Sequence, residues 1–272
     1  MAATFGISPQ QASVDVGQYE KMAPDNVVYD PAAKAYRRAE HFTPAFLNDA
    51  VEPHLQQLVA IENGWLQAED TWFDAMPPLE VTTLRRRSTE PSVLLRVLDA
   101  LHNRLEIDIE YGSLTGSVEL ERTIAPHALA YCAGRWYVRC WSRGHNDFRD
   151  YNLNRITSVP GSRPTNADPG LDFEWMHQMD LVILPNPELS QRRQSAVAWE
   201  HGMTDGRLVV PCRLSLSYYL MSEHNLDVAP GVLEPQKQQI VLENREEVTQ
   251  ARKLARKMSI EALARAQGAD VV

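Results

Sequence analysis

Apolar and charged residues alternate strictly between positions 105 and 111, where every odd position is apolar and every even position is acidic. A period of two residues predicts a β-strand that buries one face. The stretch 112–117 (G-S-L-T-G-S) predicts a turn, and 118–124 predicts a returning strand. On that strand Arg122 shares a face with three aliphatic residues, and a guanidinium in such a place must be paired or face a ligand.

Further strands are predicted at 128–132, 135–141 and 148–153, the last two separated by a turn around Gly144. A helix that starts at Pro91 and carries leucines along one side precedes all of them. Together these segments predict a small, strongly bent sheet.

The N-terminal segment predicts a helix followed by a hairpin. A proline and a capping-box glutamine follow Ser8, and apolar residues recur at helical spacing up to Lys21. Residues 27–29 and 35–38 then predict two short strands around a turn. A polar-faced helix followed by a small hairpin is typical of the second half of a winged helix-turn-helix. Since only four residues precede the first phenylalanine, we expect a partial winged helix-turn-helix domain over 1–44.

A second helix is predicted between Ala45 and Trp65, inside a region, 45–89, that we interpret as a helical linker and dimerisation region. The aromatic residues that follow are interpreted as core packing rather than as a ligand cage. The basic run 84–87 belongs to a kind that is usually solvated, although beside a DNA-binding domain it could contact phosphate.

The pattern changes again beyond a segment rich in proline, glycine, asparagine and aspartate at 160–170. Strand, helix, strand, helix and strand are predicted in turn between 179 and 242, and an amphipathic helix over 246–267 follows. We therefore expect a compact α+β unit over 171–272. The apolar stripe of its last helix packs inside the chain or, as the alternative, forms a dimer contact.

Composition places the chain among ordinary globular proteins. Its 272 residues are 44% hydrophobic and 23% charged, enough for two or three domains with their own cores. No apolar stretch reaches the roughly 18 residues of a membrane span, and the N-terminus lacks a signal-peptide pattern. We therefore expect a cytoplasmic protein with no membrane partner. Three cysteines without a C-x-x-C pair exclude a disulfide scaffold and a zinc finger.

The net charge of −9 is unevenly spread along the chain. Residues 101–163 are slightly positive, and all their basic side chains are arginines, because no lysine occurs between Lys34 and Lys237. This bias reflects either a GC-rich genome or a need for rigid guanidinium forks that bind phosphate or carboxylate. An acidic total excludes little, since binding depends on local charge.

Catalytic signatures are absent from the sequence. It contains no phosphate-binding loop, zinc-protease motif, nucleophile elbow or dinucleotide-binding motif, and its eight histidines are scattered without metal-ligand spacing. The sequence therefore predicts a protein that is not an enzyme and has no metal site and no cofactor.

The candidate binding chemistry lies on two strands that flank Gly144. The first strand projects Tyr137 and Arg139 to one side, and the second projects Arg149 and Tyr151 to one side. Pairing about Gly144 places Arg139 opposite Arg149. Like charges opposite each other destabilise a sheet unless a bound anion or acidic side chains neutralise them. Rings and arginines together suit stacked bases and phosphates. The alternative is a structural ion-pair network, for which the acidic candidates are Glu119, Glu121 and Asp147.

Residues 5–46, FGISPQQASVDVGQYEKMAPDNVVYDPAAKAYRRAEHFTPAF, resemble the recognition helix, wing and exit strand of WYL-domain transcriptional regulators. These include the regulators of BREX and CBASS phage-defence operons. In such a domain the helix enters the major groove of DNA, where short polar side chains near its start read base edges. The predicted DNA-binding residues are Ser8, Gln10, Gln11 and Ser13 in the helix and Lys34, Arg37 and Arg38 in the wing.

The segment 90–160 resembles the WYL domain itself, an Sm-like five-stranded β-barrel. The resemblance rests on Tyr111, Arg122, Pro126-His127, Trp136-Tyr137-Val138, Arg149-x-Tyr151 and Arg155-Ile156. It implies that this domain senses a nucleotide or a single-stranded nucleic acid. The predicted effector-binding residues are Tyr137, Arg139, Arg149, Tyr151 and Arg155, with Ser113, Arg122 and His127 at the rim.

The sequences LVILPNPELS and GMTDGRLVV resemble the C-terminal extension of the same regulators, a ferredoxin-like WCX-type module. We therefore expect an α+β multidomain regulator, a repressor of an anti-phage defence operon that binds a double-stranded DNA operator as a homodimer. The alternative is a nucleotide or single-stranded nucleic-acid sensor that does not itself bind a promoter.

Overall fold

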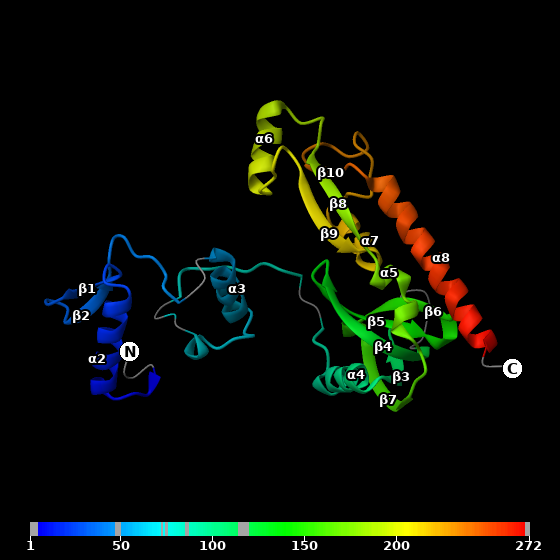
Figure 1. Ribbon diagram of the computed structural model, residues 1–272, viewed down its shortest axis with the longest axis horizontal. Coiled ribbons are helices and arrows are strands. Elements are labelled where there is room, and N and C mark those ends of the chain that lie inside the picture. Colours follow the sequence, from blue (N-terminus) through cyan, green and yellow to red (C-terminus); the bar gives the residue numbers. More distant parts are fainter. Residues whose placement is uncertain are drawn as a thin grey trace. The chain divides into compact units, whose positions relative to one another are not determined.

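The computed structural model describes residues 5–46, 50–71, 73, 76–84, 87–113 and 120–269. The chain divides into two compact units, Met1–Leu84 and Arg85–Val272 (Figure 1). Parts of the sequence predictions lie outside the described residues. These parts are positions 47–49 of the predicted helix 45–65, Trp72 among the aromatic residues, Arg85 and Arg86 of the basic run, and positions 114–119, which include most of the predicted turn and Glu119.

The first unit begins with helix α2 (Pro9–Met22), which is followed by a hairpin of strands β1 (Val27–Asp30) and β2 (Ala35–Arg38). The predicted helix start is confirmed, because the Ser8 hydroxyl accepts a hydrogen bond from the Gln11 backbone N–H at 3.1 Å. No residue of α2 is buried. The helix therefore leaves its polar face open to a partner.

Asn26 fastens the helix to the segment that leaves the hairpin. Its buried side chain donates hydrogen bonds to Tyr19 Oη and to the Thr43 carbonyl, and it accepts one from the Thr43 N–H. The unit continues with α3 (Val51–Glu62), which lies inside the predicted helix 45–65, and a 3₁₀ turn, η1 (Ala68–Asp70).

The second unit opens with helix α4 (Pro91–Asn103), which packs on a five-stranded antiparallel sheet in the order β6-β5-β4-β3-β7. The strands are β3 (Leu105–Tyr111), β4 (Leu120–Cys132), β5 (Arg135–Ser142), β6 (Asp147–Asn152) and β7 (Ile156–Pro164). Two 3₁₀ turns, η2 (Arg143–His145) and η3 (Leu153–Arg155), join β5 to β6 and β6 to β7. The core between the sheet and α4 includes Val97, Ile107, Ile124 and Val138, all fully buried.

Two predicted boundaries in this sheet are wrong. The segments 118–124 and 128–132 were expected as separate strands, but β4 is one strand, because a bulge between Pro126 and Ala128 bends it without ending it. Strand β7 was not predicted from the sequence pattern, and it runs to Pro164, which pairs with Leu105. The first part of the expected linker 160–170 therefore belongs to the sheet.

The rest of the second unit is the predicted α+β arrangement. After η4 (Pro169–Leu171) and α5 (Phe173–Met176), the chain forms β8 (Gln178–Pro185), α6 (Gln191–Glu200), β9 (Leu208–Arg213), α7 (Leu214–Glu223), β10 (Ile240–Leu242) and α8 (Arg245–Ala269). The sheet has the order β10-β8-β9 and is antiparallel.

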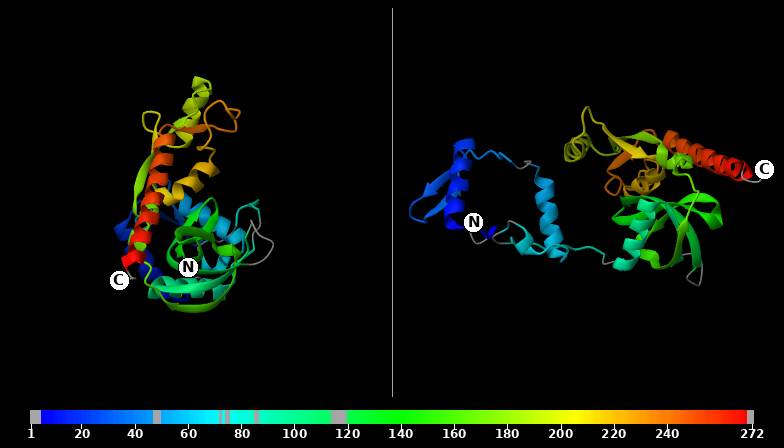
Figure 2. Two further views of the ribbon diagram at one scale, coloured as in Figure 1. Left: turned by 90° about the vertical axis from the view of Figure 1, so that its right-hand side faces the viewer. Right: turned by 60° about the horizontal axis from the view of Figure 1, so that its bottom comes forward.

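Helix α8 reaches beyond its own sheet. It contacts α5 and α7 and continues alongside β6 of the five-stranded sheet (Figures 1 and 2). Val248 packs in the core of the three-stranded sheet, whereas Leu263 packs with Trp141 and Phe148 of the larger one. Among the described residues, no helix is both long and apolar enough to cross a membrane.

Candidate functional site

The pairing of β5 with β6 decides which side chains share a face. Val138 lies opposite Tyr151, Arg139 opposite Asp150 and Cys140 opposite Arg149. The expected pairing of Arg139 with Arg149 is therefore wrong by one residue. The cause is the connection, in which four residues separate Ser142 from Asp147, and Asn146 closes it with a left-handed φ of 44°. A shift of one residue moves every side chain of a strand to the other face.

The register places Arg139 on the outer face of the sheet, among acidic side chains. Its guanidinium donates two hydrogen bonds to Asp172, at 2.7 and 2.8 Å, one to Asp150 at 3.1 Å and one to Glu174 at 3.4 Å. Arg139 is 3% exposed and Asp172 is fully buried. We call Arg139, Asp150, Asp172, Glu174 and His127 the outer-face network. Arg139 is therefore part of a structural ion-pair network, although none of its acidic partners is among the candidates named from the sequence.

Burial and ion pairing act in opposite directions within this network. Burial raises the pKa of Asp150 and of Glu174, and the Arg139 charge offsets this only in part. Burial acts in the same sense on Asp172, but hydrogen bonds from Arg139 and His127 outweigh it, so the pKa of Asp172 is lowered. Asp172 is thus the carboxylate that holds Arg139 most firmly.

Two other predicted effector residues also belong to the outer face. His127 Nε2 lies 2.9 Å from Asp172 Oδ2, and its ring packs edge-on against Phe148. Tyr137 is 6% exposed, and its ring lies 4.5 Å from that of Tyr219 in α7. These side chains, like Arg139, are occupied by contacts with the C-terminal elements.

The inner face, which lines the core between the five-stranded sheet and α4, carries a different set of groups. Arg122 Nη1 donates to His145 Nε2 at 3.3 Å, His145 Nδ1 lies 2.9 Å from Ser142 Oγ, and Ser142 Oγ lies 2.9 Å from Tyr151 Oη. The Arg122 guanidinium also lies over the Tyr151 ring, 5.8 Å from its centroid. Arg149 projects from the same side of β6 as Tyr151, because the two are two positions apart on the strand. We call these five residues the inner-face cluster.

The hydrogen-bond chain indicates which tautomer the neutral His145 ring adopts. Arginine only donates, so Nε2 accepts and the proton of the neutral ring sits on Nδ1, facing Ser142. Partial burial and the charges of Arg149 and Arg122 lower the pKa of His145 from its usual 6.5. The two arginines are thus permanently charged, whereas their charges disfavour the protonated form of the neighbouring His145.

The inner-face cluster has unused bonding capacity. The Nε atoms of Arg122 and Arg149 are buried, and neither has a hydrogen-bond partner among the described residues. Tyr111 packs edge-on against Tyr151, with ring centroids 4.9 Å apart. Guanidinium donors beside aromatic rings can bind a phosphate and stack a base.

The remaining predicted effector residues adjoin this cluster in the fold. Tyr111 ends β3 and is followed by Gly112 and Ser113, and the Gly112 N–H donates to the Arg155 carbonyl at 2.9 Å. Ser113 and Arg155 are thus brought near the same end of the sheet. Sequence reasoning missed Ser142 and His145. A loop of four residues between β5 and β6 would have been the signal, since it places Ser142 on the same face as Tyr151.

The predicted DNA-binding residues of the first unit are all exposed. Gln11 donates a hydrogen bond to Asp15 within the helix, at 2.7 Å. In the wing Arg37 forms an exposed ion pair with Asp30, at 2.7 Å. Lys34 occupies a left-handed turn position with φ of 49°. Ser8 serves as the N-cap of α2. Gln10 and Ser13 lie on α2, and Arg38 lies on β2.

Comparison with known domain families matches three parts of the chain. Residues 1–60 match the winged helix-turn-helix domain of the BrxR transcriptional regulator, residues 92–160 match the WYL domain, and residues 178–248 match the C-terminal dimerization domain of the BrxR transcriptional regulator. A winged helix, a WYL barrel and this C-terminal domain in one chain define a WYL-domain transcriptional regulator.

Comparison with curated proteins shows which WYL-domain transcriptional regulators this chain is similar to. The DNA-binding transcriptional repressor CapW of Pseudomonas aeruginosa is 31% identical over 246 residues, which cover 90% of this chain and 82% of the relative. CapW of Stenotrophomonas maltophilia is 29% identical over 249 residues, covering 90% and 83%. The chain therefore belongs to the family of CapW-type WYL-domain regulators. Among solved structures, proteasome accessory factor B/C of Arthrobacter aurescens is 17% identical with a TM-score of 0.31, over 92% of this chain and 40% of that one.

Proposed function

We propose that this protein is a DNA-binding transcriptional repressor of an anti-phage defence operon, and that its WYL domain senses an anionic effector. The CapW relatives are named DNA-binding transcriptional repressors, and they align with 90% of the chain. A match to a dimerization domain over 178–248 supports action as a homodimer on a two-fold symmetric operator.

The exposed start of α2 carries the DNA-binding part of the proposal. Gln10, Gln11 and Ser13 lie in its first two turns and are open to solvent, where a recognition helix reads base edges. Arg37 and Arg38 on β2 supply positive charge for phosphate contacts. Arg37 forms an exposed ion pair with Asp30, which phosphate can replace at little cost.

The inner-face cluster carries the effector part. Arg122 and Arg149 each have a buried Nε atom without a described hydrogen-bond partner, and the rings of Tyr151 and Tyr111 lie beside them. We assign the effector site to Arg122, His145, Arg149 and Tyr151, with Ser113 and Arg155 at its edge. A nucleotide or a short single strand supplies both the phosphate and the base that such groups bind. Tyr137, Arg139 and His127 are instead assigned to the contact between the barrel and the C-terminal elements.

The DNA-binding proposal is tested with a fluorescent duplex from upstream of the protein's own gene. We expect Gln11→Ala to relax discrimination against a scrambled duplex, because a glutamine that reads a base contributes about 1–3 kcal/mol of specificity. We expect Arg37→Gln to weaken both duplexes about equally and to reduce the salt dependence by about one phosphate contact. Arg207→Gln, which alters an exposed ion pair in the second unit, is the matched control.

The outcome that contradicts the assignment is equally specific. If both variants bind both duplexes like the unaltered protein, α2 and the wing are not the DNA-binding surface. Binding of single-stranded oligothymidylate without any binding of the upstream duplex would favour the alternative, a sensor that does not itself bind a promoter.

A further inference from the structure

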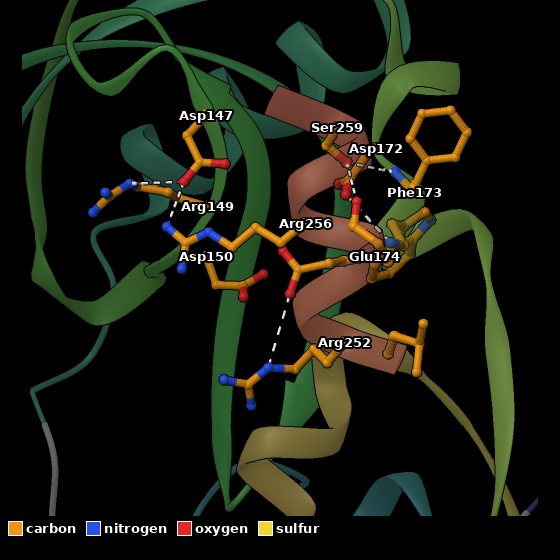
Figure 3. Close-up of polar contacts among 12 residues, drawn as sticks. Asp147, Arg149, Asp150, Asp172, Phe173, Glu174, Arg252, Arg256 and Ser259 are labelled. Carbon is orange, nitrogen blue, oxygen red and sulfur yellow. Dashed lines mark hydrogen bonds and ion pairs between the residues drawn. The ribbon is translucent and has the colours of Figure 1, made fainter. Parts of the chain in front are cut away.

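Asp147, the first residue of β6, connects two arginines that belong to different parts of the second unit. Its Oδ2 atom lies 3.8 Å from Arg149 Nε and 2.5 Å from Arg256 Nη2 on helix α8 (Figure 3). The side chain is 5% exposed, and its other oxygen, Oδ1, is buried without a hydrogen-bond partner among the described residues. One buried carboxylate is thus shared between the inner-face cluster and α8.

The two contacts of Asp147 are unequal. The contact with Arg256 is a short charge-assisted hydrogen bond, whereas the contact with Arg149 is too long for one. Arg149 remains 41% exposed, and its Nε atom makes no hydrogen bond to a described residue. A phosphate oxygen could give Arg149 the short bonds that Asp147 does not. An anionic ligand therefore competes with Asp147 for this guanidinium.

Helix α8 is fastened to the rest of the unit by the same kind of contact. Arg252 lies one turn before Arg256, and its Nε atom is 3.9 Å from Glu174 Oε1 (Figure 3). Ser259 Oγ accepts a hydrogen bond from the Phe173 N–H at 2.9 Å. The helix begins at Arg245, inside the segment that matches the dimerization domain. A change in the Asp147–Arg256 pair therefore acts on an element that is continuous with that domain.

We propose that Asp147 is an internal competitor for the effector, and that it couples occupancy of Arg149 to the hold of the barrel on α8. This proposal rests on the proposed effector site. When a phosphate binds Arg149, Asp147 is left to Arg256 alone and holds α8 more firmly. By linkage, weakening the Asp147–Arg256 pair leaves Asp147 to Arg149 and lowers the affinity for the effector.

The test measures binding of a short fluorescent oligothymidylate to the full chain by anisotropy. Asp147→Asn removes the competitor and should tighten binding roughly tenfold. Glu121→Gln removes an equal charge from an exposed neighbour of Arg122 and should change binding roughly twofold at most. The difference separates competition from a general change in charge.

Arg256→Gln provides a second test, because the half-exposed Arg256 is the residue that donates the short hydrogen bond to Asp147. Urea unfolding of this variant is measured alongside, so that a loss of binding is compared only between folded proteins. Arg256→Gln should weaken oligothymidylate binding roughly threefold, and this effect should vanish when Asp147→Asn is also present. Arg252→Gln lies on the same side of α8 but contacts Glu174, so it should leave binding unchanged.

The outcomes distinguish the proposed competition by Asp147 from the proposed effector site on which it rests. If Arg122→Gln and Arg149→Gln bind oligothymidylate like the unaltered protein, the effector site itself is wrong. If those variants lose binding but Asp147→Asn behaves like Glu121→Gln, the competition is wrong. If Arg256→Gln has the same effect with and without Asp147→Asn, the coupling to α8 is wrong.

Discussion

Arg139 and Arg149 show how far a single residue's role depends on its face of the sheet. They are ten positions apart on neighbouring strands and look equivalent in the sequence. Arg139 points outward to three carboxylates and is almost fully buried, whereas Arg149 points inward and keeps a loose pair with Asp147. The residue type was sufficient to single out both as unusual. The length of the loop between β5 and β6 sets the register that places these two arginines on opposite faces of the sheet.

His145 gives a prediction at the same scale. Its pKa in the folded, unliganded protein lies below the usual 6.5, and a bound anion would raise it. Anion binding then takes up a proton, so affinity increases as the pH falls. We expect oligothymidylate to bind more tightly at about pH 5.5 than at about pH 7.5. The ratio of the two affinities should be roughly threefold larger in the unaltered protein than in His145→Gln. Phosphodiesters do not titrate in this range, and the other histidines are common to both proteins.

The same shift has a consequence of opposite sign for stability. Because the folded-state pKa of His145 is lowered, the unfolded chain binds more protons as the pH falls through 6.5. The contribution of this group to stability is therefore complete above pH 6.5 and is lost as the pH falls below it.

The binding prediction has a clear contradicting outcome. An identical pH dependence of oligothymidylate binding in His145→Gln and in the unaltered protein would mean that His145 is not part of the effector site.

Elements with a strong local signal could be predicted from the sequence. The alternation at 105–111 is β3, and the capped helix from Ser8 is α2, because both patterns depend on near neighbours. The bulge in β4 and the β5–β6 register could not be predicted in this way. Each depends on one residue more or less in a connection, and hydropathy carries no signal for that.

The attachment of β5 to α5 depends on Arg139 and gives a prediction at the scale of elements. Arg139→Met would leave the buried Asp172 carboxylate without its guanidinium partner, although the contacts with His127 and the Trp175 N–H remain. Loss of one member of a buried ion pair typically costs about 3–5 kcal/mol. We expect the free energy of unfolding, measured by urea titration at neutral pH, to fall by about 3 kcal/mol. Arg207→Met, which breaks an exposed pair with Glu243, should cost less than about 1 kcal/mol.

An equal loss of stability in the two variants would contradict the structural role of Arg139. It would leave room for the original expectation that this guanidinium binds the effector. A stable Arg139→Met protein that no longer binds oligothymidylate would support that expectation directly.

At the scale of the whole molecule, the sequence showed the order of the parts but not their contacts. The N-terminal helix and wing, the WYL segment and the C-terminal module were each indicated by local patterns, and the family matches agree with that order. The contacts of Arg139 with Asp172 and of Asp147 with Arg256 join residues 33 and 109 positions apart. No local pattern indicates such pairs, so the candidate site could be predicted only as a set of residue types.

We expect anion binding at the inner-face cluster to change the affinity of the protein for operator DNA. The measurement is the anisotropy of a fluorescent upstream duplex in complex with the full chain while unlabelled short oligothymidylate is added. We expect the oligonucleotide to lower operator affinity roughly tenfold in the unaltered protein. In a chain that carries both Arg122→Gln and Arg149→Gln, we expect unchanged operator binding and no response to the oligonucleotide. If both proteins respond alike, or if neither responds, the effector site assigned here is contradicted.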